Sequence, residues 1–501
     1  MTDPFAPAGD SSREDWRRFA LLAAILIIFR SAAFMIWPQV HFDSDQAVHG
    51  LMAKHIAEFR AFPVFMYGQS YLLAVEAWVA APFFAVAGAS VVTLKLPLLL
   101  MNVAIAALLV RTFCRETGLR PALAFAASLF FVLPAPGTAA QLVEASGENI
   151  EPFLYVVLLW LTRNRPNWGG LILGIGFLNR EFTIYGLAAL LVIEAARGVL
   201  FTRDGIKRRL IMARGAAEVW LLVTWLKQYS SAAGPHTSLA DLNVQQPDNV
   251  RELLNHICID PQTMIVGTWN ALSTHLPRLF GMTMQPLAEF GIESKVRQGL
   301  PGGWIILAAL LIIAATRVAM RLFADRRWRS EYDPCVYLVL VGLFSFGANA
   351  ILRCGFIGVM RYDLLSILGA TGLAAWYLRI EHVRRMRMLW IVLLAAWTAI
   401  TVVPHVGLWG EYLSHPQAGA KRLIIRQLEF QGTRFAYADY WLAYYITFVT
   451  DERIIVAATD SVRVREHNRI VDAHRDEAVL VSRRSCPGGR QIAGGVYLCS
   501  P

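Results

Sequence analysis

Long apolar runs dominate the hydrophobic pattern of this chain. Eleven of them, separated by shorter polar segments, predict helices that cross a membrane. A soluble domain does not tolerate so many such runs, so the pattern predicts an all-α polytopic membrane protein with about eleven spans. The runs are Phe19–Trp37, Val91–Val110, Pro121–Gly137, Ile150–Leu161, Trp168–Leu178, Phe182–Ala196, Met212–Tyr229, Gly302–Thr316, Cys335–Leu352, Asp363–Leu378 and Met388–Trp409.

One further apolar segment, Tyr71–Gly88, carries Glu76 and follows a charged loop. The positive-inside rule decides its placement. If the segment does not span, the predicted cytoplasmic regions hold 23 Lys and Arg residues and the outer loops hold nine. If it spans, every later loop changes side and the rule is violated repeatedly. We therefore expect a helix lying on the outer interface, where Glu76 stays in contact with water.

This topology divides the chain into a cytoplasmic N-terminus (1–18), a transmembrane domain (19–409) and an extracytoplasmic domain (410–501). The transmembrane domain has two long outer loops, 38–90 and 230–301, and the second is expected to contain an interfacial helix near Met264–Phe280. The last domain reads as a small soluble α/β domain. Its predicted helices are Gln417–Phe430 and Trp441–Val449, and its predicted strands are Arg434–Ala438, Arg453–Ala458, Ala478–Ser482 and Gly495–Cys499.

Composition supports this picture and excludes several other classes. Hydrophobic residues make up 56% of the chain and charged residues 17%, which excludes a disordered, collagen-like or ordinary cytosolic protein. The net charge of +10 follows from the cytoplasmic loops, so we expect no nucleic-acid partner. Six cysteines are too few for a disulfide framework, although Cys486 and Cys499 can pair if the last domain lies outside. We expect the inner (plasma) membrane as the location.

Charged residues gather on the predicted outer face, where charge at a bilayer is costly and often functional. Two acids one residue apart suit a general base or a divalent-metal clamp, and arginines at the same level suit a phosphate group. The candidate residues are Asp43, Asp45, His49, Glu148, Glu151, Arg180, Arg361 and Tyr362. In contrast, His236, His256 and His275 lack ligand spacing, so no zinc site is expected among them.

Several of the candidates also have a purely structural explanation. The Asp-x-Asp pair can cap a helix, Arg180 can pair with Glu181, and Arg361 can reach toward the interface. Glu148 can be a solvated loop charge, and Arg30, inside the first predicted helix, is expected to pair internally. The convergence of the candidates on one face, more than any single residue, favours a functional site.

These motifs, in this order, resemble those of the GT-C glycosyltransferases, in particular the protein O-mannosyltransferase and aminoarabinose transferase branch (glycosyltransferase families 39 and 83). Asp45-Gln46 stands where that branch has an Asp-Glu pair, so Gln46 replaces the second acid. Glu151-Pro152-Phe153 is similar to its Asp-Pro-Phe, and Arg361-Tyr362 to its Arg-Tyr. Arg180 stands for the Lys of a Thr-Lys-Gly element. The resemblance covers roughly residues 15–410 and leaves the last domain unexplained.

The resemblance implies inverting transfer of a sugar from a polyprenyl-phosphate donor to an acceptor outside the membrane, which is a glycan, a lipid or a protein. Asp45 is then the general base, and Asp43 either assists it or holds a divalent metal ion such as Mg²⁺ or Mn²⁺. Arg180, Arg361 and Tyr362 bind the donor phosphate. The remaining candidates, His49, Glu148 and Glu151, contact the acceptor or line the cleft.

Two other functions remain open from the sequence. A lipid or glycan transporter, including a flippase, binds a similar substrate without covalent chemistry. Such proteins usually show internal repeats and polar groups at the membrane midplane, whereas this chain has no repeat and its polar cluster lies at one face. A non-catalytic scaffold whose last domain binds a glycan or a partner protein is the third option.

Overall fold

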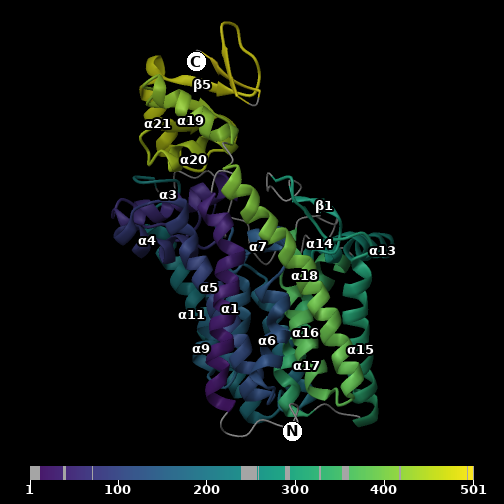
Figure 1. Cartoon of the computed structure of the whole chain (residues 1–501). Coiled ribbons are helices and arrows are strands. Elements are labelled where there is room, and N and C mark those ends of the chain that lie inside the picture. The colour runs from purple at the N-terminus through teal and green to yellow at the C-terminus, as the bar shows by residue number, and fades with distance from the viewer. Residues whose placement is uncertain are drawn as a thin grey trace.

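The computed structural model describes residues 12–37, 41–69, 72–237, 257, 259–287, 294–325, 329–352, 360–416, 419–493 and 495–499. Each of the eleven predicted runs contains a helix, and these helices form an upright bundle (Figure 1). They are α1 (Ser12–Ile36), α5 (Val91–Glu116), α6 (Pro121–Val132), α8 (Glu151–Leu161), α9 (Pro166–Asn179), α10 (Thr183–Ala196), α11 (Arg203–Leu226), α15 (Trp304–Asp325), α16 (Asp333–Gly347), α17 (Ser366–Ile380) and α18 (Arg384–Ser414).

Five helical segments in the described part of the chain are long and apolar enough to cross a membrane alone. They are Trp16–Ile36, Val91–Glu116, Trp304–Asp325, Ser330–Leu352 and Arg384–Ser414. Three shorter apolar helices of the bundle, α6, α8 and α10, pack among them. The prediction of an all-α membrane protein is therefore confirmed.

Two helices extend well beyond their apolar runs. The helix α11 begins at Arg203 rather than Met212, so its first turns are polar. Thr202 caps this earlier start by accepting a hydrogen bond from the backbone N–H of Gly205. The helix α18 spans Arg384–Ser414 instead of Met388–Trp409. It therefore continues four residues past 410, the predicted start of the last domain.

The first outer loop folds into α3 (Ser44–Ala57) and α4 (Val75–Ala87), which lie side by side at the upper end of the bundle (Figure 1). Asp43 caps α3 by accepting a hydrogen bond from the backbone N–H of Gln46 at 3.0 Å. The expectation that Glu76 stays in contact with water was wrong. Glu76 is fully buried in the first turn of α4, next to small residues that let α4 approach its neighbours.

The remaining outer segments are short. The helix α7 (Pro136–Gln141) follows α6, and η1 (Lys227–Tyr229) follows α11. The predicted interfacial helix near Met264–Phe280 is a continuous set of three elements, α13 (Pro261–Asn270), η3 (Ala271–His275) and α14 (Leu276–Leu279). After it, β1 (Gln285–Pro286) pairs antiparallel with β2 (Arg297–Gln298). The other short outer elements are η6 (Ala348–Leu352) and η7 (Met360–Asp363), whereas η5 (Ser330–Tyr332) lies at the opposite end of the bundle, between α15 and α16.

The last part of the chain is an α/β domain at the upper end of the molecule (Figure 1). Its sheet has the order β4-β3-β5-β7-β6, parallel on one side and antiparallel on the other. All four predicted strands and both helices are present, within the described residues. Three elements were missed, α21, η8 and β6. The elements are α19 (Ala420–Phe430), β3 (Phe435–Ala438), α20 (Tyr440–Val449), β4 (Ile455–Ala458), α21 (Arg465–Ala473), η8 (Arg475–Glu477), β5 (Val479–Ser482), β6 (Arg490–Ala493) and β7 (Val496–Cys499).

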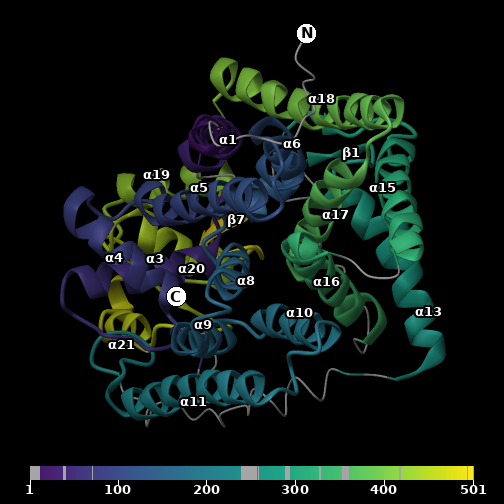
Figure 2. The same ribbon diagram turned by 90° about the horizontal axis from the view of Figure 1, so that it is seen from below.

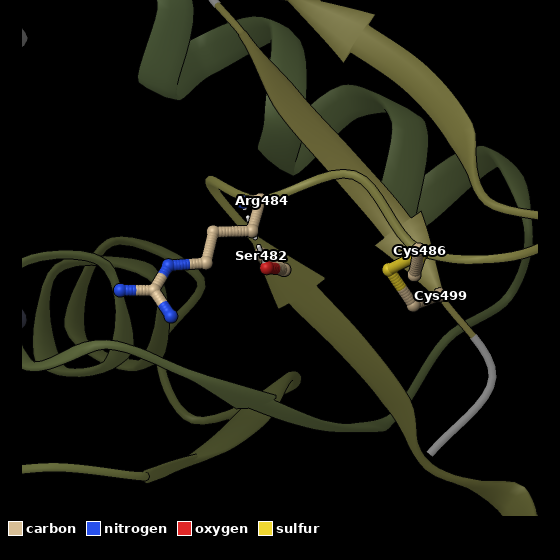
Figure 3. The surroundings of a disulfide bond; sticks show 4 residues. All are labelled: Ser482, Arg484, Cys486 and Cys499. Carbon is tan, nitrogen blue, oxygen red and sulfur yellow. Dashed lines mark hydrogen bonds between the residues drawn. A yellow bond between two sulfur atoms is a disulfide. The ribbon is translucent and has the colours of Figure 1, made fainter.

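A disulfide joins Cys486 to Cys499 at the end of β7, with 6.0 Å between the two Cα atoms (Figure 3). It closes the hairpin of β6 and β7 onto the turn that follows β5, where the backbone N–H of Arg484 donates to Ser482 Oγ at 3.0 Å. This pairing is the one expected for a domain in an oxidising compartment.

Candidate active site

The two predicted phosphate-binding arginines meet at one carboxylate. Arg180 Nη2 lies 2.6 Å from Glu148 Oε2, and Arg361 Nη1 lies 2.5 Å from Glu148 Oε1. Glu148 therefore bridges the two guanidinium groups. Its side chain is 7% exposed, whereas that of Arg361 is 30% exposed. The interpretation of Glu148 as a solvated loop charge is excluded.

The local backbone structure places both arginines next to the Glu148 carboxylate. The helix α9 ends at Asn179, and Arg180 takes an extended conformation with φ of −157°. Arg361 lies in the short helical turn η7. Each guanidinium also lies 5.5 Å from an aromatic ring centre, Arg180 from Phe182 and Arg361 from Tyr362. Those two rings meet edge to face at 5.9 Å and so join the two segments.

The two predicted acids of the first outer loop lie at the start of α3. Asp43 is the helix cap, so the structural explanation holds for one of its oxygens. Asp45, half-buried in the first turn, accepts a short hydrogen bond from the hydroxyl of Tyr440. Tyr440 is the first residue of α20, so the last domain contributes directly to this site.

The loop 142–150 connects the acids to the arginines. Gln46 Oε1 accepts a hydrogen bond from the backbone N–H of Ala145 at 3.2 Å. Asn179 Nδ2 donates to the backbone oxygen of Gly147 at 2.6 Å. The loop is thus held by α3 on one side and by the end of α9 on the other. Gln46, which replaces the expected second acid, has a structural role here.

His49 and Glu151, the other predicted site residues, are buried beside this loop. His49 Nδ1 lies 3.2 Å from the backbone oxygen of Asp45, and burial lowers the pKa of this imidazole. Glu151 is 1% exposed in the first turn of α8. A Cβ atom at Gly147, whose φ is +73°, would come within 3.0 Å of His49 Nε2. Glycine is therefore required for this close approach.

The sequence did not single out two polar residues at this end of the bundle, Lys95 and Tyr440. Lys95, fully buried in α5, donates to the backbone oxygens of Phe34 and His41 at 3.3 and 2.7 Å. The sequence did contain a signal for Lys95, because an ionisable residue inside an apolar run is often functional. Tyr440 had no such signal, because its partner belongs to a segment nearly 400 residues away. The expectation for Arg30 is confirmed, since its Nη2 donates to Asn102 Oδ1 at 2.6 Å.

Glu144 gives the site a measurable pH dependence. Burial, helped by the nearby Asp43 carboxylate and opposed by Lys95 and Arg361, raises the pKa of Glu144 from 4.5 to about 8. A carboxyl group with a raised folded-state pKa holds its proton in the folded protein, so its ionisation costs stability as pH rises from about 5 to about 8. We expect Glu144→Gln to lessen the fall in Tm over this range by a few degrees, measured by thermal unfolding in detergent. An identical pH dependence in both proteins would contradict the assignment.

A divalent ion at Asp43 and Asp45 fits the donor chemistry, because Mg²⁺ and Mn²⁺ prefer carboxylate oxygens. The hydrogen bonds to Gln46 and Tyr440 engage one oxygen of each carboxylate. The second oxygens of Asp43 and Asp45 would hold the ion, which would supply positive charge to a phosphate.

Comparison with known proteins identifies the fold. No protein-family model and no curated protein sequence matches this chain. The oligosaccharyltransferase AglB from Archaeoglobus fulgidus, in complex with an inhibitory peptide and a dolichol-phosphate, superposes with a TM-score of 0.52 at 11% identity. The match covers 95% of this chain and 70% of AglB. The chain has a GT-C fold.

Two further comparisons give the range of similarity to GT-C structures. The apo form of the same archaeal oligosaccharyltransferase has a TM-score of 0.50 at 11% identity, covering 93% of this chain and 69% of that one. ArnT from Cupriavidus metallidurans, bound to undecaprenyl phosphate, has a TM-score of 0.38 at 12% identity, covering 95% of this chain and 97% of that one. The two AglB structures confirm the resemblance seen in the sequence at the level of the GT-C fold.

Proposed function

We propose that this protein is a glycosyltransferase that moves a sugar from a polyprenyl-phosphate donor to an acceptor outside the membrane, with inversion. The observation that carries the proposal is the pair of arginines held on Glu148, at the same end of a GT-C fold as Asp45. AglB, a protein of this fold, was solved with a dolichol-phosphate, which is the same class of lipid phosphate.

The proposed reaction assigns one step to each group. Asp45 takes the proton from the acceptor hydroxyl or amine as that atom bonds to the anomeric carbon. The bond between the anomeric carbon and the phosphate oxygen breaks, and its electron pair stays on the phosphate. Arg180 and Arg361 stabilise this growing charge, while Glu148 keeps the two guanidinium groups in place. Tyr362, beside Arg361, completes the donor-phosphate site.

The proposed orientation places this site outside the plasma membrane, with the N-terminus in the cytoplasm. The positive-inside count favours it, and the disulfide in the last domain fits an oxidising compartment. His49 and Glu151, buried beside the loop 142–150, are then the residues that shape the acceptor side, whereas Glu148, also expected there, holds the two arginines.

A donor panel tests the proposal. Purified protein is incubated with polyprenyl-phosphate sugars of different sugar type, with and without acceptor candidates, and released polyprenyl phosphate is measured by mass spectrometry. We expect release from at least one donor by the wild-type protein and none by Asp45→Asn. Intact donors throughout, from a panel that an established transferase does cleave, would contradict the proposal.

Tyr440 is a positioning residue for Asp45 in this mechanism. Its hydroxyl fixes the carboxylate, so we expect Tyr440→Phe to lower kcat about tenfold, as loss of a hydrogen bond to a charged group usually does. KM for the donor should change little, because the arginines are untouched. The matched control is Tyr437→Phe, which removes a 2.7 Å hydrogen bond to the exposed Asp472 elsewhere in the same domain. Equal kcat values in all three proteins would contradict the role of Tyr440.

A further inference from the structure

Where the last domain meets α3, three side chains from distant segments turn toward one point. They are His55 of α3, Glu452 after α20 and His467 of α21. One nitrogen or oxygen atom from each lies within 4.8 Å of the others. This is the one such group of three in the described part of the chain that could hold a metal ion. We propose that it is a zinc site that joins the last domain to the first outer loop.

The distances are close to those of a metal site. His55 Nε2 lies 3.1 Å from Glu452 Oε1, and His467 Nε2 lies 3.6 Å from the same oxygen. Ligands of a tetrahedral zinc ion, with bonds of about 2.1 Å, lie roughly 3.4 Å apart. Small side-chain movements would therefore complete the geometry, and a fourth position would be left for water.

His467 provides the second, independent observation. Its side chain is 3% exposed, and neither of its ring nitrogens has a hydrogen-bond partner. Burying an imidazole whose nitrogens have no partner costs free energy. A metal ion bound by Nε2 would give that nitrogen a partner. His55 has the support that metal-binding histidines usually show, because its other nitrogen, Nδ1, lies 3.0 Å from the hydroxyl of Tyr67.

The surrounding charges leave room for a divalent cation. Glu452 Oε2 binds Arg60 and Lys54 at 2.7 and 3.0 Å, on the side away from the histidines. Those two cations are themselves matched by Glu58, 2.9 Å from Arg60, and by Asp451, 2.7 Å from Lys54. The group therefore carries a net negative charge before any metal is added. Two imidazoles and one carboxylate favour Zn²⁺ over Mg²⁺ or Ca²⁺, which prefer all-oxygen sites.

The site would fix the last domain on α3, the helix that also carries Asp45. The proposed zinc site does not depend on sugar transfer, so measurements of zinc binding test it. Full-length protein is stripped with a chelator, dialysed against zinc chloride and analysed for bound metal. We expect about one zinc per chain for the wild-type protein, a higher Tm with zinc than without it, and no such effect of magnesium chloride. A stripped protein that takes up no zinc would overturn the proposal.

Variants assign the ligands. His467→Gln should lose the bound zinc, whereas the control His415→Gln, at an exposed histidine beyond α18, should retain it. Undiminished zinc in His467→Gln would overturn the site. If that variant does not fold, His467→Cys loaded with cobalt chloride replaces it, because a thiolate ligand produces a charge-transfer band in the near ultraviolet. Cobalt bound by His467→Cys without this band would equally overturn the assignment.

Discussion

Asp45→Asn is expected to lower the rate of sugar transfer about a thousandfold while the protein stays folded. The amide has nearly the same shape as the carboxylate and can still accept the hydrogen bond from Tyr440, so packing against α20 is kept. It cannot accept the acceptor's proton at the moment of attack. The loss should therefore appear in kcat, with donor binding little changed, measured as released polyprenyl phosphate over time.

Two controls make this prediction specific. Asp472→Asn changes another carboxylate that accepts a hydrogen bond from a tyrosine hydroxyl, in α21 of the last domain, and should keep full activity. Asp43→Asn keeps the α3 cap, since Asn caps helices about as well as Asp, so any loss there reports the carboxylate charge and not the helix. Normal transfer by Asp45→Asn would show that another group is the base.

Arg361→Ala is expected to lower kcat about a hundredfold, and Arg180→Ala to have a similar effect. Both side chains would stabilise the charge on the departing lipid phosphate, which is greatest in the transition state. Arg361→Lys should restore only part of the rate, because an ammonium group cannot bind Glu148 and a phosphate oxygen through the same planar fork. Initial rates across a range of donor concentrations measure the effect on kcat and KM separately.

The matched control is Arg317→Ala. Arg317 also pairs with a glutamate, Glu381, at 2.6 Å, but it lies in a region predicted to be cytoplasmic. We expect this variant to lose some stability and to keep its transfer rate once folded. If Arg317→Ala and Arg361→Ala lose activity equally, the arginine pair on Glu148 has no special role in the reaction.

The sequence predicted the helices well because their cause is local. A run such as Val91–Val110 is apolar over its whole length, and no other structure satisfies its backbone in a membrane. The ends of the helices were harder to predict, because helices continue into polar residues beyond the apolar runs. Arg203 begins α11 through the Thr202 cap, and Ser414 ends α18 well beyond its apolar run.

The sequence also singled out several residues that the structure brings together in the candidate site. It did not predict which of these residues pair with one another. Charge at the ends of apolar runs marked Glu148, Arg180 and Arg361. Their meeting at one carboxylate depends on how three segments come together, the loop 142–150, the end of α9 and η7, which no local pattern encodes. The burial of Glu76 also depends on tertiary packing, so the sequence led us to expect this side chain in water. The first turn of α4 faces the loop 142–150, and the amphipathic pattern of a helix does not reveal such a contact.

The last domain takes on a clearer role in this account. It supplies Tyr440 to Asp45, and the backbone N–H of Tyr445 donates to Ser44 Oγ at 3.3 Å at the start of α3. The domain therefore covers the helix that carries the proposed base. The view from below the bundle shows its strands and helices, in yellow-green, behind α3 and α4 (Figure 2).

Sugar transfer is tested most directly by a single-turnover experiment with purified protein in vesicles, in excess over a donor whose sugar carries a radioactive label. We expect the label to leave the lipid and appear on the acceptor, with one polyprenyl phosphate formed per sugar transferred, in the wild-type protein and not in Asp45→Asn. A donor that is recovered intact but on the opposite leaflet of the vesicle would contradict the proposed transfer, because the protein would then move the lipid without chemistry.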